Sequence, residues 1–108
     1  MRILFDPGTP APLIPFLAGH AVTKARQAGW DRLVNGELLA AAEGAGFDVL
    51  VTTDKRMRYQ QNLTGRRIAL VVLRNAQWPV LRQYVERVVS AVNMATEGGY
   101  IEVHVPFE

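Results

Sequence analysis

The chain has 108 residues, of which 49% are apolar, and it contains no cysteine. This is the length of one domain, 1–108, that buries a core of its own, and the composition excludes a disordered chain, disulfide bonds and a zinc–thiolate site. The formal net charge is only +2. The absence of cysteine agrees with a reducing compartment, so we expect a cytoplasmic protein. No stretch approaches the ~20 apolar residues of a membrane span, so we expect no membrane partner.

Strand and helix signals alternate along the chain. In order, the pattern predicts a strand at 2–6, a short helix at 11–18, a strand at 20–23, a helix at 37–43, strands at 49–53 and 67–73, a long helix from Pro79 and a strand at 100–105. Such alternation is typical of a three-layer α/β/α sandwich around a mostly parallel sheet.

Three of these segments carry the clearest patterns. The middle residues of two predicted strands, 3–5 and 49–51, are apolar on successive positions, which favours strands covered on both faces. The segment 100–105 alternates between apolar and polar side chains, which favours a half-exposed strand at an edge of the sheet. The helix from Pro79 carries a broad valine-rich face that suits either the core or a homodimer interface.

Two of the buried strands are followed by an aspartate, Asp6 and Asp54. Ligands of open α/β sheets bind outside the carboxyl ends of the strands. Glu37 belongs to the first turn of the helix at 37–43, which a crossover connection starts on the same side of the sheet. Three carboxylates converging there would suit Mg²⁺ or Mn²⁺, which would activate water for cleavage of a phosphodiester.

Each of these acids also has an ordinary structural interpretation. An aspartate after a strand is a common turn residue, and Asp54 would then pair with Lys55 or Arg56. A glutamate in the first turn of a helix favours the helix dipole by about 0.3–1 kcal/mol.

The segment after Asp54 is rich in groups that bind phosphate. Arginine and amide side chains contact phosphate oxygens, and a tyrosine ring stacks on a base. The candidate RNA-binding residues are Arg56, Arg58, Tyr59, Gln61 and Asn62, together with Asn35, and Thr53 is a further candidate for holding a phosphate or a water. The alternative interpretation is a polar surface helix whose tyrosine packs on the core.

Together these residues resemble the PIN-like nuclease superfamily, most closely a branch of short bacterial PIN-like proteins. The resemblance rests on Asp6 after the first strand, on NGELL at 35–39, on AGFDVLVTTD at 45–54 and on KRMRYQQNL at 55–63. It runs from the first strand to about Leu73, and more loosely beyond.

The resemblance implies a PIN fold, a Mg²⁺ or Mn²⁺ site made by Asp6, Glu37 and Asp54, and cleavage of RNA. Many members of the superfamily are toxins held by an antitoxin protein, so an antitoxin partner is expected as well. Two positions depart from the family pattern: Asn35 stands where relatives often have aspartate, and Arg56 where they often have a further acid. The alternative is therefore a PIN-like fold that has lost catalysis and binds RNA or a partner protein.

Overall fold

A computed structural model describes residues 1–33, 35–54, 56–57 and 63–106, apart from the side chain of Asn35. In this part of the chain, five strands form one parallel sheet in the order β2-β1-β3-β4-β5. The elements are β1 (Arg2–Phe5), the 3₁₀ helix η1 (Ala11–Leu17), β2 (Ala21–Lys24), α1 (Asn35–Gly44), β3 (Val49–Thr52), β4 (Ala69–Leu73), α3 (Trp78–Leu81), the 3₁₀ helix η2 (Arg82–Tyr84), α4 (Val85–Met94) and β5 (Tyr100–Val103). The predicted α/β class and parallel sheet are confirmed.

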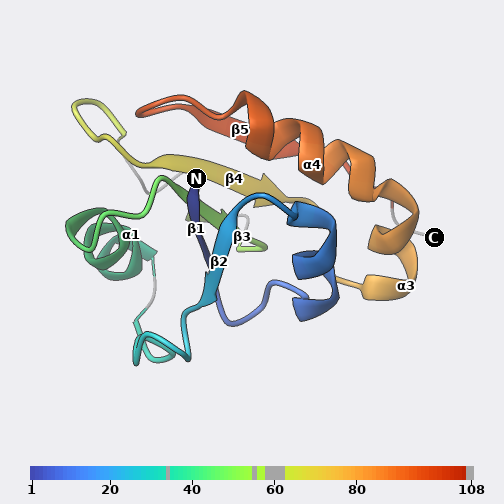
Figure 1. Ribbon diagram of the computed structural model, residues 1–108, viewed down its shortest axis with the longest axis horizontal. Helices are drawn as coiled ribbons and strands as arrows, with labels where there is room; N and C mark the ends of the chain where they lie inside the picture. The colour runs from blue at the N-terminus through green and yellow to red at the C-terminus, as the bar shows by residue number, and fades with distance from the viewer. Residues whose placement is uncertain (34, 55, 58–62, 107–108) are drawn as a thin grey trace.

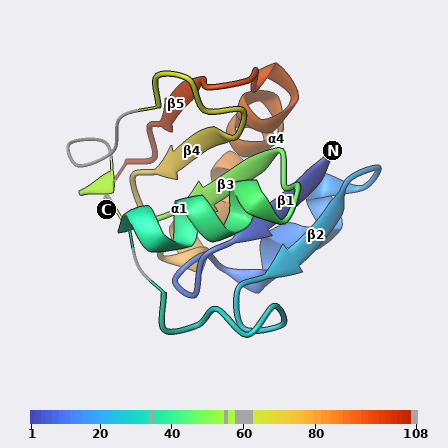
Figure 2. The same ribbon diagram turned by 90° about the vertical axis from the view of Figure 1, so that its left-hand side faces the viewer.

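Helices cover both faces of the sheet (Figures 1 and 2). Successive strand residues point to opposite faces, so Ile3 and Phe5 join one hydrophobic cluster while Leu4 joins the other. The cluster around Leu4 includes side chains of α1. The cluster around Phe5 includes side chains of η1 and α4. The interior strands β3 and β4 are buried at every position, as the apolar run at 49–51 predicted for β3.

Because the described strands are parallel, the sheet has two chemically distinct ends. We call the end formed by Phe5, Lys24, Thr52, Leu73 and Val103 the carboxyl rim, and the end formed by Arg2, Ala21, Val49, Ala69 and Tyr100 the amino rim. Figure 2 shows α1 running opposite to the strands, so that this helix begins at the carboxyl rim and ends at the amino rim.

Side chains tie the loop between α1 and β3 to the amino rim. Arg2 donates from its backbone N–H to Asp48 (2.8 Å) and from its guanidinium to the carbonyl of Ala45 (2.6 Å), while the guanidinium lies 4.4 Å from the ring centroid of Phe47. These contacts fix the turn through which the chain enters the central strand β3.

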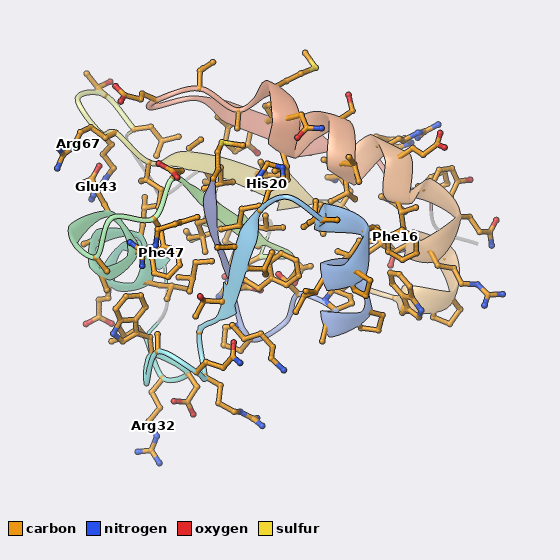
Figure 3. The ribbon with its side chains drawn as sticks, viewed as in Figure 1. Phe16, His20, Arg32, Glu43, Phe47 and Arg67 are labelled. Carbon is orange, nitrogen blue, oxygen red and sulfur yellow. The ribbon has the colours of Figure 1, made fainter. Side chains whose placement is uncertain are left out.

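A second tie at this rim joins α1 to the approach to β4. Glu43 accepts hydrogen bonds from the backbone N–H of Arg67 (2.7 Å) and from the guanidinium of Arg66 (3.0 Å). Figure 3 shows the side chain of Glu43 beside Arg67 at this end of α1.

Two helical predictions need correction. The long helix expected from Pro79 is divided: α3 passes directly into the 3₁₀ helix η2, and the backbone then leaves the helical region at Tyr84 (φ −125°, ψ 22°) before α4 begins. The helix expected at 11–18 is a 3₁₀ helix with Pro15 as its fifth residue, later than the first turn. A proline inside the segment lacks the N–H that an α-helical ladder needs.

The C-terminal elements otherwise follow the predictions. The strand β5 lies at an edge of the sheet, with Ile101 and Val103 packed into the core. Val88 and Val92 of α4 are also core residues, which confirms the core interpretation of this face; the homodimer stays a prediction. No helix among the described residues combines the length and apolar character that crossing a bilayer requires.

Candidate functional site

Asp6 follows β1 at the carboxyl rim, where three donors hold its partly buried carboxylate. Its Oδ1 accepts hydrogen bonds from the backbone N–H of Gly8 (3.1 Å) and from the hydroxyl of Thr9 (2.6 Å). Its Oδ2 accepts a hydrogen bond from the hydroxyl of Thr52. A carboxylate offers about four lone-pair positions; among the described residues, donors occupy two on Oδ1 and one on Oδ2.

Thr52 connects the two predicted aspartates. Its hydroxyl donates to Asp6 and accepts from the backbone N–H of Asp54 at 3.0 Å. The connection arises because β1 and β3 are adjacent and Phe5 pairs with Val51, so Asp6 and Thr52 leave the sheet side by side. The prediction that Asp6 and Asp54 share one rim of neighbouring parallel strands is confirmed.

Asp54 pairs with Arg56. Its Oδ1 accepts from the backbone N–H (2.9 Å) and Nε (3.1 Å) of Arg56, and its Oδ2 accepts from Nη2 (3.1 Å). The guanidinium hydrogen bonds hold the pKa of the Asp54 carboxyl below its ordinary value, against the opposing effect of partial burial. The Arg56 side chain is 72% exposed, and exposed ion pairs contribute little to stability because water screens them, so the arginine can exchange this partner for another.

Glu37 is exposed in the first turn of α1, and therefore lies toward the carboxyl rim with the two aspartates. The rim does not bring the three acids into one cluster: among the described residues, no three His, Asp or Glu side chains are close enough to hold a metal ion together. The two aspartates are joined through Thr52, whereas no described residue links Glu37 to them in this way.

The remaining predicted residues fall into two groups. Thr53 is partly buried, and its hydroxyl lies 2.9 Å from where a Cβ on Gly8 would stand, so the glycine leaves room for it. The predictions for Arg58, Tyr59, Gln61 and Asn62, and for the side chain of Asn35, lie outside the described residues.

The sequence predictions missed Thr9 and Thr52, both buried. Thr9 also lies within hydrogen-bond distance of the carbonyl of Val51 (3.0 Å), so its side chain joins the loop after β1 to the strand β3. A signal was present in the adjacent hydroxyls of Thr52 and Thr53 at the end of an apolar strand, but only the register of β1 against β3 identifies the one that reaches Asp6.

In comparisons with known proteins, no family model matches the chain, and no curated protein or solved structure is significantly similar to it.

Proposed function

We propose that this chain is a Mg²⁺- or Mn²⁺-dependent endoribonuclease of the PIN-like type. The observation that carries the proposal is the pair Asp6 and Asp54, which follow adjacent parallel strands at the point where the strand order reverses. Crevices at such a switch point are where open α/β sheets bind their ligands.

The donor set fits a hard divalent cation. Magnesium is usually held by one or two carboxylates together with water and substrate phosphates, not by a complete protein cage. Asp6 and Asp54 would hold the ion, whereas Glu37, the third predicted ligand, does not cluster with them among the described residues. When bound, the ion would neutralise phosphate charge and lower the pKa of a water for attack on the phosphodiester.

The described side chains would prepare this site in two ways. Thr52 fixes the orientation of Asp6 through its hydrogen bond, and among the described residues no second donor contacts Oδ2. Arg56 neutralises Asp54 in the resting protein, and its exposure lets it move to an RNA phosphate when substrate arrives.

A second candidate function is a binding module for RNA that has lost catalysis. It is favoured by Arg56, which donates to both oxygens of Asp54, and by the separation of Glu37 from the two aspartates. In this case the pair would persist and the protein would not respond to divalent cations.

Thermal unfolding with added Mn²⁺ or Mg²⁺ tests the site. A ligand specific to the native state stabilises it by about 2.7 kcal/mol at a hundred times its Kd, and about 1 kcal/mol corresponds to a rise of roughly 4–8 °C for a domain of this size. We expect such a rise in the wild-type protein, its loss in Asp6→Asn and Asp54→Asn, and a larger rise in Arg56→Gln. Glu97→Gln, an exposed acid outside the carboxyl rim, is the control and keeps the wild-type response.

Cleavage of a labelled single-stranded RNA by the same variants decides between the two functions. The nuclease predicts metal-dependent cleavage that EDTA and Asp54→Asn abolish. RNA binding without a metal response and without cleavage would establish the binding module instead. Cleavage that survives Asp54→Asn would show that the acids at the carboxyl rim do not carry the reaction.

A further inference from the structure

A cavity of about 500 Å³ opens at the carboxyl rim beside Asp6, on the side of β1 that faces β2. Its wall comes from three loops: residues 6–11 after β1, residues 24–27 at the end of β2, and Ala76 and Trp78 at the start of α3. The volume falls in the range of about 300–1,000 Å³ that is usual for ligand sites.

Hydrogen bonds hold each of the three loops in place. In the first loop, Thr9 bonds to Asp6. In the second, the side chain of Gln27 accepts from the backbone N–H of Lys24 (2.8 Å). In the third, buried Asn75 donates to the carbonyl of Pro106 (3.2 Å) and accepts from the N–H of Gln77 (2.9 Å). A cavity with walls fixed in this way is formed before a ligand arrives, which lowers the entropic cost of binding.

The chemistry of the wall suits a nucleotide. Lys24 and Arg26 are exposed there, and within the described part of the chain neither has a carboxylate oxygen within 4.0 Å. Against these two cations the wall carries one acid, Asp6. Trp78 is partly buried and is steadied by the ring of Phe16, with 6.2 Å between centroids. By contrast, neither Asp6 nor Asp54 lines the cavity between α4 and β5, whose wall instead carries Glu86 and Glu102.

We infer that this cavity is a nucleotide subsite for single-stranded RNA, in which Trp78 stacks on a base while Lys24 and Arg26 contact phosphates. The inference rests on the proposed function and adds to it the path of the substrate. The register pairs Phe5 with Lys24, so a phosphate bound at Lys24 lies one strand away from the carboxylate of Asp6. A base bound in the cavity therefore flanks the phosphodiester at the acids.

Fluorescence of Trp78 tests the subsite without any need for catalysis. The chain has two tryptophans, so Trp30→Phe leaves Trp78 as the sole reporter. With EDTA present, titration with a uridine hexamer should quench this fluorescence to saturation. Adenosine monophosphate and inorganic phosphate serve as separate probes, and each should bind much more weakly than the hexamer.

Charge variants identify the phosphate contacts. Anisotropy of a labelled hexamer should show binding weakened roughly tenfold or more in Lys24→Ala/Arg26→Ala, and a slope of log K against log salt reduced by about 1.4, or 0.7 for each lost contact. Trp78→Phe should retain most of the affinity and Trp78→Ala should lose roughly five- to a hundredfold. Arg32→Ala is the matched control, because this arginine projects from the loop after β2 into solvent (Figure 3), and it should bind as wild type.

The outcomes separate this inference from the proposed function. Quenching with the expected charge dependence supports the subsite even where the metal and cleavage tests fail. Unchanged Trp78 fluorescence, or equal weakening by Arg32→Ala and the double variant, overturns the subsite even where Asp54→Asn abolishes cleavage. Adenosine monophosphate binding as tightly as the hexamer overturns the polynucleotide assignment.

Discussion

Glu43 shows how one carboxylate at the amino rim holds two elements together. It lies on α1 and accepts hydrogen bonds from the N–H groups of Arg67 and Ile68 and from the side chain of Arg66. The bond from Arg67, with smaller effects of Ile68 and Arg66, keeps the pKa of the Glu43 carboxyl below its ordinary value of 4.5, although desolvation acts in the opposite direction. The ionised form of the Glu43 carboxyl is therefore more stable in the folded chain than in the unfolded chain.

This lowered pKa sets the sign of an acid dependence. Because the folded value lies below the unfolded one, Glu43 contributes stability that is fully present above about pH 4.5 and is lost as the pH falls through the lowered value. We expect Glu43→Gln to be less stable than wild type to urea at pH 7, with a difference that shrinks as the pH falls below 4.5. Glu97→Gln is the control; a pH-independent difference for Glu43→Gln would contradict the role of its charge.

At the scale of elements, two neighbouring glycines end α1 in different ways. Gly44 is the last residue of the helix, and a Cβ built on it meets no atom within 4 Å. Gly46 has a φ of +86°, and a Cβ there would stand 2.9 Å from Nη1 of Arg2. Of these two glycines, Gly46 is therefore the one whose position requires the absence of a side chain.

This difference leads to a matched pair of substitutions. Gly44→Ala should be neutral or should stabilise the protein by up to about 1 kcal/mol, since alanine favours a helix over glycine. Gly46→Ala should destabilise it by about 1–2 kcal/mol, because a residue with a Cβ resists the left-handed region. Urea unfolding measures both, and equal effects of the two alanines would contradict this account of the turn.

The elements were predicted well where one local pattern decided them. The continuous apolar run before Asp54 placed β3 to within one residue, because a strand covered on both faces can be identified from its own residues without knowledge of the neighbouring strands. The break at Tyr84 carries no proline or glycine, so helical spacing continued across it in the sequence. At the site, the rim shared by Asp6 and Asp54 was predicted, but the link through Thr52 depends on the register between β1 and β3. The cavity beside Asp6 needs three loops that are distant in sequence.

For the whole molecule, the central position of β3 predicts which backbone amides are best protected from exchange with solvent. All four residues of β3 are buried, and β1 and β4 pair with it on either side, whereas β2 is an edge strand whose residues are exposed or half-buried. Buried central amides exchange with solvent only through the largest openings, while edge amides exchange through local ones.

Hydrogen exchange followed by mass spectrometry checks this order. We expect the amides of Val49–Thr52 to exchange last, at the free energy of global unfolding, and those of Ala21–Lys24 to exchange earlier. Gly46→Ala should lower the protection of β3 by the same free energy as it lowers global stability. Equal protection of β2 and β3 would show that the sheet opens as one unit.

The uniform direction of the described strands separates two tasks between opposite ends of the molecule. The contacts of Arg2 and Glu43 with the backbone are made at the amino rim, while among the residues that line the cavity beside Asp6, Ala25 belongs to the core and Trp78 packs against it. Descendants of this chain can therefore acquire new specificity by exchanging the short segments around the cavity, and the scaffold beneath them carries over unchanged.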